Sequence, residues 1–239
     1  MLQVRPVPLL ADNYGWLLRD GSGFTTFVDP AEDGPAAAAV EAAGGRLDMI
    51  LLTHHHADHV AGTDALRQRF GAKVAGAAAD AHRLPSLDHA LSPGQHFVLG
   101  SSRAEVIDTP GHTRGHVAYF LAADSVLLVG DTIFSLGCGR LIEGTANEMF
   151  SSLKRLAALP GESRVCCGHE YTLANARFAL SLRPDDQALQ ARADEARQSR
   201  AAGAPTVPTL IEEERRLNPF LLARDTAEFA RIRALKDRF

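Results

Sequence analysis

The residues best suited to chemistry lie in one short tract, Thr53-His54-His55-His56-Ala57-Asp58-His59. The tract follows the apolar run Met49-Ile50-Leu51-Leu52, which is typical of a buried strand, and precedes a stretch with helical periodicity. Imidazole and carboxylate groups at this spacing can converge on a metal ion. On an extended chain His54 and His56 point the same way and His55 points elsewhere. Asp58 and His59 lie where the chain turns into the next helix. A chance surface cluster is the alternative, but the preceding strand and the aspartate favour half of a metal site.

Three more residues with metal-binding side chains follow short apolar runs. His112 ends the segment Val106-Ile107-Asp108-Thr109-Pro110-Gly111-His112, Asp131 follows Val126-Leu127-Leu128-Val129-Gly130, and His169 follows Val165-Cys166-Cys167-Gly168. In α/β folds functional residues gather at the ends of strands. A lone histidine at one such place is more often structural, but four strand ends with ligand side chains together favour a single site.

Five histidines and two aspartates suit a centre of two metal ions. The set divides into one ion on His54, His56 and His112, a second ion on Asp58, His59 and His169, and a bridge formed by Asp131. Two ions would then share one hydroxide, because a bound dication lowers the pKa of water towards about 7. Nitrogen and oxygen donors suit zinc, and also iron or manganese. We therefore expect two divalent ions per chain, with zinc as the first choice.

The elements that must position these residues alternate along the first 169 residues. The expected strands cover residues 24–29, 49–53, 73–75, 105–108, 117–121, 125–129 and 164–167, and the expected helices cover 34–43, 60–70 and 147–158. This order predicts an α/β domain over residues 1–169 with sheets covered by helices.

After Glu170 alanine, leucine, arginine and glutamate dominate, and β-branched runs nearly vanish. We expect an all-helical domain over residues 170–239, with helices over 173–182, 185–202, 210–217 and 226–238. Thr209 with Glu212, and Asp225 with Glu228, have the spacing of helix N-terminal capping boxes. From residue 170 onward there are 12 Lys+Arg and 11 Asp+Glu. This near balance, without interleaved aromatic residues, gives no support for binding to nucleic acid.

The composition is that of an ordinary soluble protein, with 46% hydrophobic and 23% charged residues. No stretch approaches the roughly 20 apolar residues of a membrane span, and the N-terminal residues lack the pattern of a signal peptide. The three cysteines, Cys138, Cys166 and Cys167, form a poor disulfide framework. We therefore expect a cytoplasmic protein without a membrane or nucleic-acid partner, and a monomer.

Taken together, these motifs resemble the metallo-β-lactamase superfamily, and within it the glyoxalase II family of hydroxyacylglutathione hydrolases. The resemblance rests on His-x-His-x-Asp-His and on the segments Thr109-Pro-Gly-His-Thr-Arg-Gly-His116, Gly130-Asp-Thr-Ile-Phe134, Gly137-Cys-Gly-Arg-Leu-Ile-Glu-Gly-Thr145, Cys167-Gly-His-Glu-Tyr171, Asn218-Pro-Phe220 and Lys236-Asp-Arg-Phe239. The metal motif is typical of the whole superfamily, whereas the glycine-rich segment and the helical tail are more specific. The resemblance covers the whole chain and implies an αββα sandwich followed by a small helical domain.

The resemblance also implies the reaction, which is hydrolysis of the thioester S-D-lactoylglutathione to D-lactate and glutathione, the second step of methylglyoxal detoxification. Metal-held hydroxide would attack the thioester carbonyl, with Asp58 and Asp131 as catalytic ligands, and a metal ion would stabilise the oxyanion. A thiol has a pKa near 8.5, so the thiolate leaves without a strong general acid. By matched position, Arg140, Tyr171, Arg233 and Lys236 are the expected contacts of the glutathione thioester.

Ile142 departs from the family pattern, because some members have a tyrosine there. A hydroxyl contact to glutathione is then missing, and weaker affinity follows. Asp29, at the end of a strand, is expected to accept a hydrogen bond from a ligand histidine. His116 is expected to have a structural or supporting role, since seven donors already complete two sites.

Two other functions compete with this interpretation. A mononuclear iron dioxygenase of glutathione persulfide, in the same superfamily, would not use Asp58, His59 and His169 for a second metal. A metal-dependent nuclease would need a basic surface that the helical tail does not provide. A β-lactamase is disfavoured because the chain shows no export signal.

Overall fold

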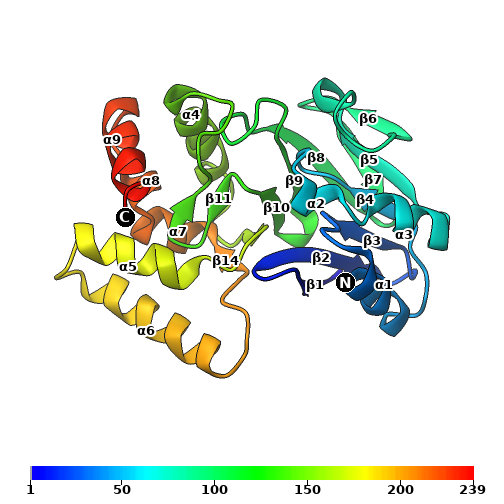
Figure 1. Cartoon of the computed structure of the whole chain (residues 1–239), viewed down its shortest axis with the longest axis horizontal. Helices are drawn as coiled ribbons and strands as arrows, with labels where there is room; N and C mark the ends of the chain where they lie inside the picture. Colours follow the sequence, from blue (N-terminus) through cyan, green and yellow to red (C-terminus); the bar gives the residue numbers. More distant parts are fainter. Residues whose placement is uncertain (1) are drawn as a thin grey trace.

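The computed structural model describes residues 2–239, and two six-stranded sheets dominate it (Figure 1). The first sheet has the order β1 (Gln3–Leu9), β2 (Asn13–Arg19), β3 (Thr25–Val28), β4 (Met49–Leu51), β5 (Lys73–Ala77) and β6 (His89–Leu91). The second has the order β14 (Thr209–Leu210), β13 (Arg164–Cys167), β10 (Val126–Gly130), β9 (Val117–Leu121), β8 (Ser102–Asp108) and β7 (His96–Leu99). Strands β3 to β6 run parallel, as do β10 and β13, and the other pairs are antiparallel.

The alternation of side chains along β4 explains the layers. Met49 and Leu51 belong to the core that also contains residues of the second sheet. Ile50 and Leu52 belong to a separate core with helices α1 (Asp33–Ala42) and α3 (Thr63–Phe70). Because successive side chains leave a strand on opposite faces, an uninterrupted apolar run is buried on both. Helix α4 (Ala146–Ala157) covers the second sheet, and the expected αββα sandwich is confirmed.

All seven expected strands of the first 169 residues are present. The helix expected over residues 60–70 is divided into α2 (Ala57–Val60) and α3. The break lies at Gly62, where a Cβ atom would lie 2.6 Å from the backbone carbonyl carbon of Glu32. The backbone of Glu32 packs so closely against position 62 that a residue with a side chain would not fit there in a continuous helix.

Several short strands were not expected from the sequence. They are β1, β2, β6, β7, β14 and a hairpin of β11 (Ile133–Phe134) and β12 (Gly137–Cys138). Strand β1 contains Pro6 and Pro8, which argue against a central strand, but β1 lies at the edge of its sheet, where proline is tolerated. Two short 3-10 helices, Ala78–Asp80 and Ala122–Asp124, complete this half of the chain.

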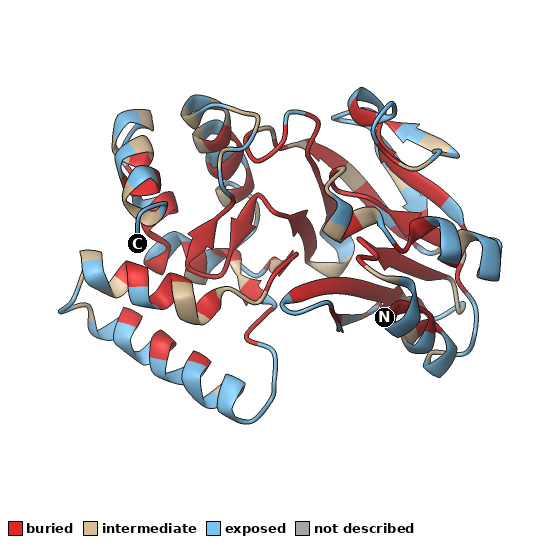
Figure 2. Ribbon diagram, viewed as in Figure 1, coloured by how far each residue is buried: buried red, intermediate tan, exposed pale blue. Residues whose placement is uncertain are grey.

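The last third consists of α5 (Thr172–Leu182), α6 (Gln187–Ala201), α7 (Ile211–Leu217), α8 (Pro219–Leu222) and α9 (Thr226–Lys236), gathered at one end of the molecule (Figure 1). The outer face of α6 is exposed and a stripe along it is buried (Figure 2). The expectation of an all-helical tail was wrong at β14, which pairs with β13. Within residues 2–239, none of the helices combines the length and apolar character that crossing a membrane requires.

One of the two expected helix caps is confirmed. Asp225 accepts a hydrogen bond from the backbone of Glu228 at the start of α9. The cap expected at Thr209 was wrong, because α7 begins after Leu210 and has no side-chain cap. The hydroxyl of Thr209 instead contacts the carboxylates of Glu213 and Glu214.

Candidate metal centre

The seven expected ligands come from four segments that end at one edge of the sandwich. His54 and His56 lie in the loop after β4, Asp58 and His59 on α2, and His112 in the loop after β8, while Asp131 follows β10 and His169 follows β13. Strand β4 ends at Leu51, so the expectation that His54 and His56 share a face of an extended strand was wrong. Their side chains nevertheless converge, because the loop itself brings them together.

The first group of donors consists of His54, His56 and His112. Nδ1 of His56 lies 3.2 Å from Nε2 of His54 and 3.0 Å from Nε2 of His112. Ligand nitrogens about 2.05 Å from a tetrahedral zinc ion are separated by ~3.4 Å. Three histidine nitrogens at this spacing match three corners of such a site, and all the donor atoms of the group lie within 4.8 Å of one another.

The second group consists of Asp58, His59 and His169, with donor atoms also within 4.8 Å of one another. Oδ2 of Asp58 lies 3.8 Å from Nε2 of His59 and 3.5 Å from Nε2 of His169. The set offers two nitrogens and one carboxylate, as the sequence predicts for a second ion.

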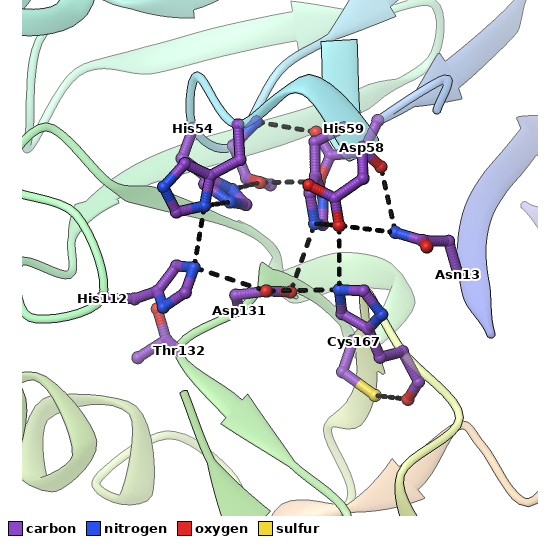
Figure 3. Close-up of polar contacts among 12 residues, drawn as sticks. Asn13, His54, Asp58, His59, His112, Asp131, Thr132 and Cys167 are labelled. Atoms are coloured by element: carbon purple, nitrogen blue, oxygen red, sulfur yellow. Dashed lines mark hydrogen bonds and ion pairs between the residues drawn. The ribbon is translucent and has the colours of Figure 1, made fainter. Parts of the chain in front are cut away.

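Asp131 lies between the two groups (Figure 3). Its Oδ1 is 3.4 Å from Nε2 of His59, and its Oδ2 is 3.4 Å from Nε2 of His112 and 3.3 Å from Nε2 of His169. The carboxylate therefore faces donors of both groups, which is the position that a bridging ligand would need.

The buried polar atoms of this centre fit bound cations. Nε2 of His59 and Oδ1 of Asp131 are buried and have no hydrogen-bond partner within residues 2–239. Burial lowers the pKa of His54 well below its usual value, so its imidazole is neutral and free to coordinate. Burial opposes ionisation of Asp131, but His59 and His169 outweigh it and hold the pKa of that carboxyl well below its usual value. Ligand atoms without a hydrogen-bond partner, a neutral imidazole and a carboxylate are the groups that a divalent metal ion binds.

Four of the five ligand histidines are oriented by a contact of the ring nitrogen that faces away from the donor group. Nδ1 of His59 lies 3.0 Å from Oδ2 of Asp29, which also accepts a hydrogen bond from the Thr53 hydroxyl at 2.6 Å. Nδ1 of His54 lies 3.0 Å from that hydroxyl oxygen, and Nδ1 of His112 lies 2.9 Å from the backbone oxygen of Arg140. Such outer contacts fix the tautomer and the direction of a metal ligand. Asp29 thus contacts a ligand histidine, as we expected from the sequence.

Two residues with the same kind of contact were missed from the sequence. Oδ1 of Asp12 lies 3.0 Å from Nδ1 of His169, and Nδ2 of Asn13 donates to Oδ2 of Asp58 at 3.2 Å. Both lie at the turn between β1 and β2. The sequence feature that could have indicated them is the Asp-Asn pair between two apolar runs, because such a pair is typical of a hairpin turn.

His116 is fully buried beneath the centre and is not one of its donors. Its Nε2 accepts a hydrogen bond from the backbone of Asp131 at 3.2 Å. Its Nδ1 therefore carries the proton and donates to the Thr109 hydroxyl at 2.8 Å. These contacts hold the Asp131 loop, which agrees with the supporting role expected for His116.

His55 points away from the metal donors into a cluster of charged residues. Its Nδ1 lies 3.1 Å from Asp80, and its Nε2 lies 3.5 Å from Glu143. Arg83 pairs with both carboxylates. Glu143 also accepts a hydrogen bond from the backbone of Arg114 at 2.9 Å, beside the His112 loop. The cluster thus joins the histidine tract to the loop that carries the third donor of the first group.

A cavity of about 620 Å³ opens onto the centre. Its walls include five of the donors and all four expected substrate contacts, Arg140, Tyr171, Arg233 and Lys236, together with Ile142. Tyr171 stacks on His169 with ring centroids 4.6 Å apart. Segments from both ends of the chain therefore meet at one cavity.

The two cations of α9 that line the cavity differ in their surroundings. Arg233 is 5% exposed, donates to the backbone oxygen of Cys138 at 2.9 Å and pairs with Asp237 at 2.8 Å. Nζ of Lys236 donates to the backbone oxygen of Ala174 at 3.1 Å. Burial lowers the pKa of Lys236 to about 8, so the ammonium is charged at neutral pH and titrates just above it.

Comparisons with known proteins agree with this geometry. Residues 12–169 match the family model of the metallo-beta-lactamase superfamily, and residues 170–239 match that of the hydroxyacylglutathione hydrolase C-terminus. A relative from Acidiphilium cryptum, named hydroxyacylglutathione hydrolase, is 58% identical over 98% of this chain and 95% of its own length.

Two solved structures share the fold. ETHE1 from Myxococcus xanthus has a TM-score of 0.74 and 24% identity, over 97% of this chain and 90% of its own. TTHA1623, solved in a di-iron-bound form, has a TM-score of 0.59 and 29% identity, over 69% of this chain and 91% of its own.

Proposed function

This chain belongs to the metallo-beta-lactamase superfamily and, within it, to the hydroxyacylglutathione hydrolases, and on that premise we propose that it hydrolyses the thioester bond of S-D-lactoylglutathione. The products are D-lactate and glutathione. One observation carries the proposal: a single cavity is lined by members of both metal-donor groups and by the basic side chains of the helical tail.

The proposed centre holds two ions, one on His54, His56 and His112 and one on Asp58, His59 and His169. When bound, the ions supply a water of lowered pKa as nucleophile and polarise the thioester carbonyl. Asp131 faces both donor groups and would bridge them. Zinc is the expected metal, and iron or manganese also suits these donors. The di-iron form of TTHA1623 supports two ions in this fold.

The remaining residues bind and orient the substrate in this proposal. Glutathione carries two carboxylates, and Arg140, Arg233 and Lys236 provide cations on the walls of the cavity. Arg233 is already held by Cys138 and Asp237, so it offers a preformed guanidinium. Tyr171 is fixed by its stacking on His169 and lines the cavity next to the donors.

The leaving group needs little help from the protein. A thiolate of pKa near 8.5 departs without a strong general acid. The thiol that lines the cavity, Cys138, is buried, which raises its pKa to about 11 and makes it a poor nucleophile. The chemistry therefore needs the metal donors and no covalent intermediate on the chain.

The test is a hydrolysis assay on metal-replete protein, with the metals quantified in the same sample. We expect turnover of S-D-lactoylglutathione. The matched control substrate is the lactoyl thioester of N-acetylcysteamine, which lacks both carboxylates. Its kcat/KM should fall by about 100-fold, because each charged hydrogen bond lost costs about 1.5 kcal/mol. No hydrolysis by loaded protein would contradict the proposal.

The persulfide dioxygenase considered as an alternative is disfavoured. Asp58, His59 and His169 are all present and their donor atoms are grouped. The full-length relative from Acidiphilium cryptum is named a hydrolase. One iron per chain together with oxygen uptake on glutathione persulfide would reverse this choice.

We further place this activity in the cytoplasm and in a monomer. Three free, buried cysteines support a reducing compartment. Both donor groups and all four expected substrate contacts lie in one chain, which supports a site that needs no second copy.

A further inference from the structure

The hairpin of β11 and β12 forms part of the cavity wall next to the metal centre. It begins two residues after Asp131, and its Phe134 and Cys138 line the cavity. Only two residue pairs hold it together, Ile133 with Cys138 and Phe134 with Gly137. Leu136, in its turn, is buried and has a φ of 58°, a left-handed conformation that is unfavourable for leucine. The hairpin therefore needs support from outside itself.

The helical tail provides that support through side chains that bond the hairpin backbone. Oε2 of Glu214 on α7 accepts a hydrogen bond from the Leu136 amide at 2.8 Å. Nδ2 of Asn218 donates to Gly137 at 3.0 Å and to Phe134 at 3.2 Å. Oε2 of Glu214 also lies 2.9 Å from Nδ2 of Asn218, whose two hydrogens are shared among these three oxygens. Glu214 thus contacts Leu136 in the strained turn and also Asn218, whose side chain is hydrogen-bonded to both strands of the hairpin.

The charge of Glu214 follows from the number of hydrogens that Thr209, Glu213 and Glu214 share. Oε1 of Glu214 and Oε2 of Glu213 lie 2.9 Å and 2.7 Å from the hydroxyl oxygen of Thr209. That hydroxyl has one hydrogen and can donate to one carboxylate. Glu213 has Arg192 from α6 at 3.3 Å, which supports its negative charge. Thr209 then donates to Glu213, and Oε1 of Glu214 must carry a proton that it donates to Thr209.

The surroundings of Glu214 agree with a neutral acid. Its side chain is fully buried, and within residues 2–239 no ion pair joins it to a cation. The charged group that acts on it is Glu213 on its own helix, and Arg192 of α6 lies 3.3 Å from Glu213. Burial, with a further contribution from Glu213, raises the pKa of Glu214 to about 7.

We propose that Glu214, as a buried neutral carboxylic acid, is a positioning residue that holds the β11–β12 hairpin against the metal centre. It acts through Leu136 and Asn218 and does not touch the substrate. Ionisation would place two carboxylates against one hydroxyl hydrogen and weaken the support of the cavity wall.

The first test is the titration of Glu214 in the whole protein, followed by the side-chain carboxyl carbon signals of ¹³C-labelled glutamate. The signal that disappears in Glu214→Gln belongs to Glu214. We expect it to titrate near pH 7, against 4.5 for an ordinary glutamate. A signal that is already ionised well below pH 6 would overturn the proposal, whatever the protein hydrolyses.

The second test is kinetic and rests on the proposed thioester hydrolysis. Glu214→Gln keeps an oxygen for Leu136 and Asn218 and an N–H for Thr209, so its KM should stay within about twofold of the wild-type value. Glu214→Ala leaves the Leu136 amide without its partner, and KM should rise about tenfold with metal content and kcat little changed. Glu212→Gln, on the exposed side of α7, is the matched control and should behave like the wild type.

The outcomes separate positioning from general stability. If Glu214→Ala loses metal in proportion to activity, or if Glu214→Gln is as impaired as Glu214→Ala, the proposal is wrong. If Glu214→Ala does not fold, the glutamine variant and the titration still decide. If neither the wild type nor any variant hydrolyses the thioester, the proposed function is wrong and the kinetic test gives no result. The titration then still tests whether Glu214 is a neutral acid.

Discussion

Asp29 fixes the orientation of one metal ligand, and the charge of that carboxylate matters as much as its shape. It faces Nδ1 of His59 at 3.0 Å and is buried with Thr53 as its other partner. In Asp29→Ala we expect the affinity for the second ion to fall about 10–100-fold, which is typical when an outer partner of a ligand is lost. Asp29→Asn keeps the size and should lose less.

Metal content per chain after dialysis against a weak chelator measures this effect. The wild type should retain two ions and Asp29→Ala about one. Unchanged metal content in Asp29→Ala would show that His59 does not depend on Asp29.

We expect Lys236 to make substrate affinity depend on pH. Its pKa is lowered to about 8 by burial, so the ammonium is present below that pH and is lost above it. If Lys236 holds a glutathione carboxylate, KM measured in the Glu214→Gln background, where the acid that titrates near pH 7 is removed, should be constant below pH 8 and should rise above it, while kcat stays nearly flat. Steady-state kinetics across this range measure the two parameters separately.

Two variants control for other titrating groups. Lys236→Met should have a high KM at every pH, and Lys236→Arg should keep a low KM beyond pH 8 because guanidinium remains charged. A KM that rises at the same pH in Lys236→Met would assign the effect to another residue.

Single functional residues could be predicted where the residue type alone indicates its chemistry, as for a metal-binding histidine. The seven donors follow from histidines and aspartates at strand ends; six of them fall into two groups of three, and Asp131 lies between these groups. Asp12, Asn13 and Glu214 were not predicted, because an aspartate, an asparagine or a glutamate is common in any sequence. Their meaning depends on which backbone lies beside them after folding.

At the scale of elements, the cluster of His55, Asp80, Arg83 and Glu143 joins two loops of the metal centre. Arg83 pairs with Asp80, whose side chain is 3% exposed, so Arg83→Met would leave a buried carboxylate without its cation. We expect the free energy of unfolding to fall by about 1–3 kcal/mol. Urea denaturation measures it.

The exposed pair of Arg224 and Glu228 provides the control. Arg224 is 84% exposed, and Arg224→Met should change stability by at most about 0.5 kcal/mol. Equal effects of the two substitutions would mean that the cluster contributes no more than an ordinary surface pair.

Elements were predictable where hydrophobic patterning is strong. The parallel strand β4 is a continuous apolar run, β3 ends with Phe27 and Val28, and both were expected, as was β5. Strand β1 was hidden by its prolines, and β11, β12 and β14 have two residues each, too few to show a period. The existence of such strands depends on partners distant in the sequence.

At the scale of the whole molecule, the metal donors tie the two sheets together. His54 and His56 follow a strand of the first sheet, and Asp131 and His169 follow strands of the second. A metal that binds the folded state alone stabilises it by about 3–4 kcal/mol when free metal exceeds Kd by about 100–1000-fold.

Removing metal with a chelator should therefore lower the melting temperature, and added zinc should restore it. Differential scanning calorimetry measures the shift. A melting temperature that does not respond to chelation of demonstrably loaded protein would show that the ions do not link the sheets. The division into domains at residues 169 and 170 stays a prediction.

The pairing of β14 with β13 also affects how the protein is made. Val165 pairs with Thr209, which leaves the ribosome more than 40 residues later. Until then β13, with Cys166 and Cys167, has one side without a partner, and an unpaired strand is a template for aggregation. A chain stopped at residue 169 would carry all seven metal donors and still present that open strand. We therefore expect this edge of β13 to be closed only after the last third of the sequence has been translated.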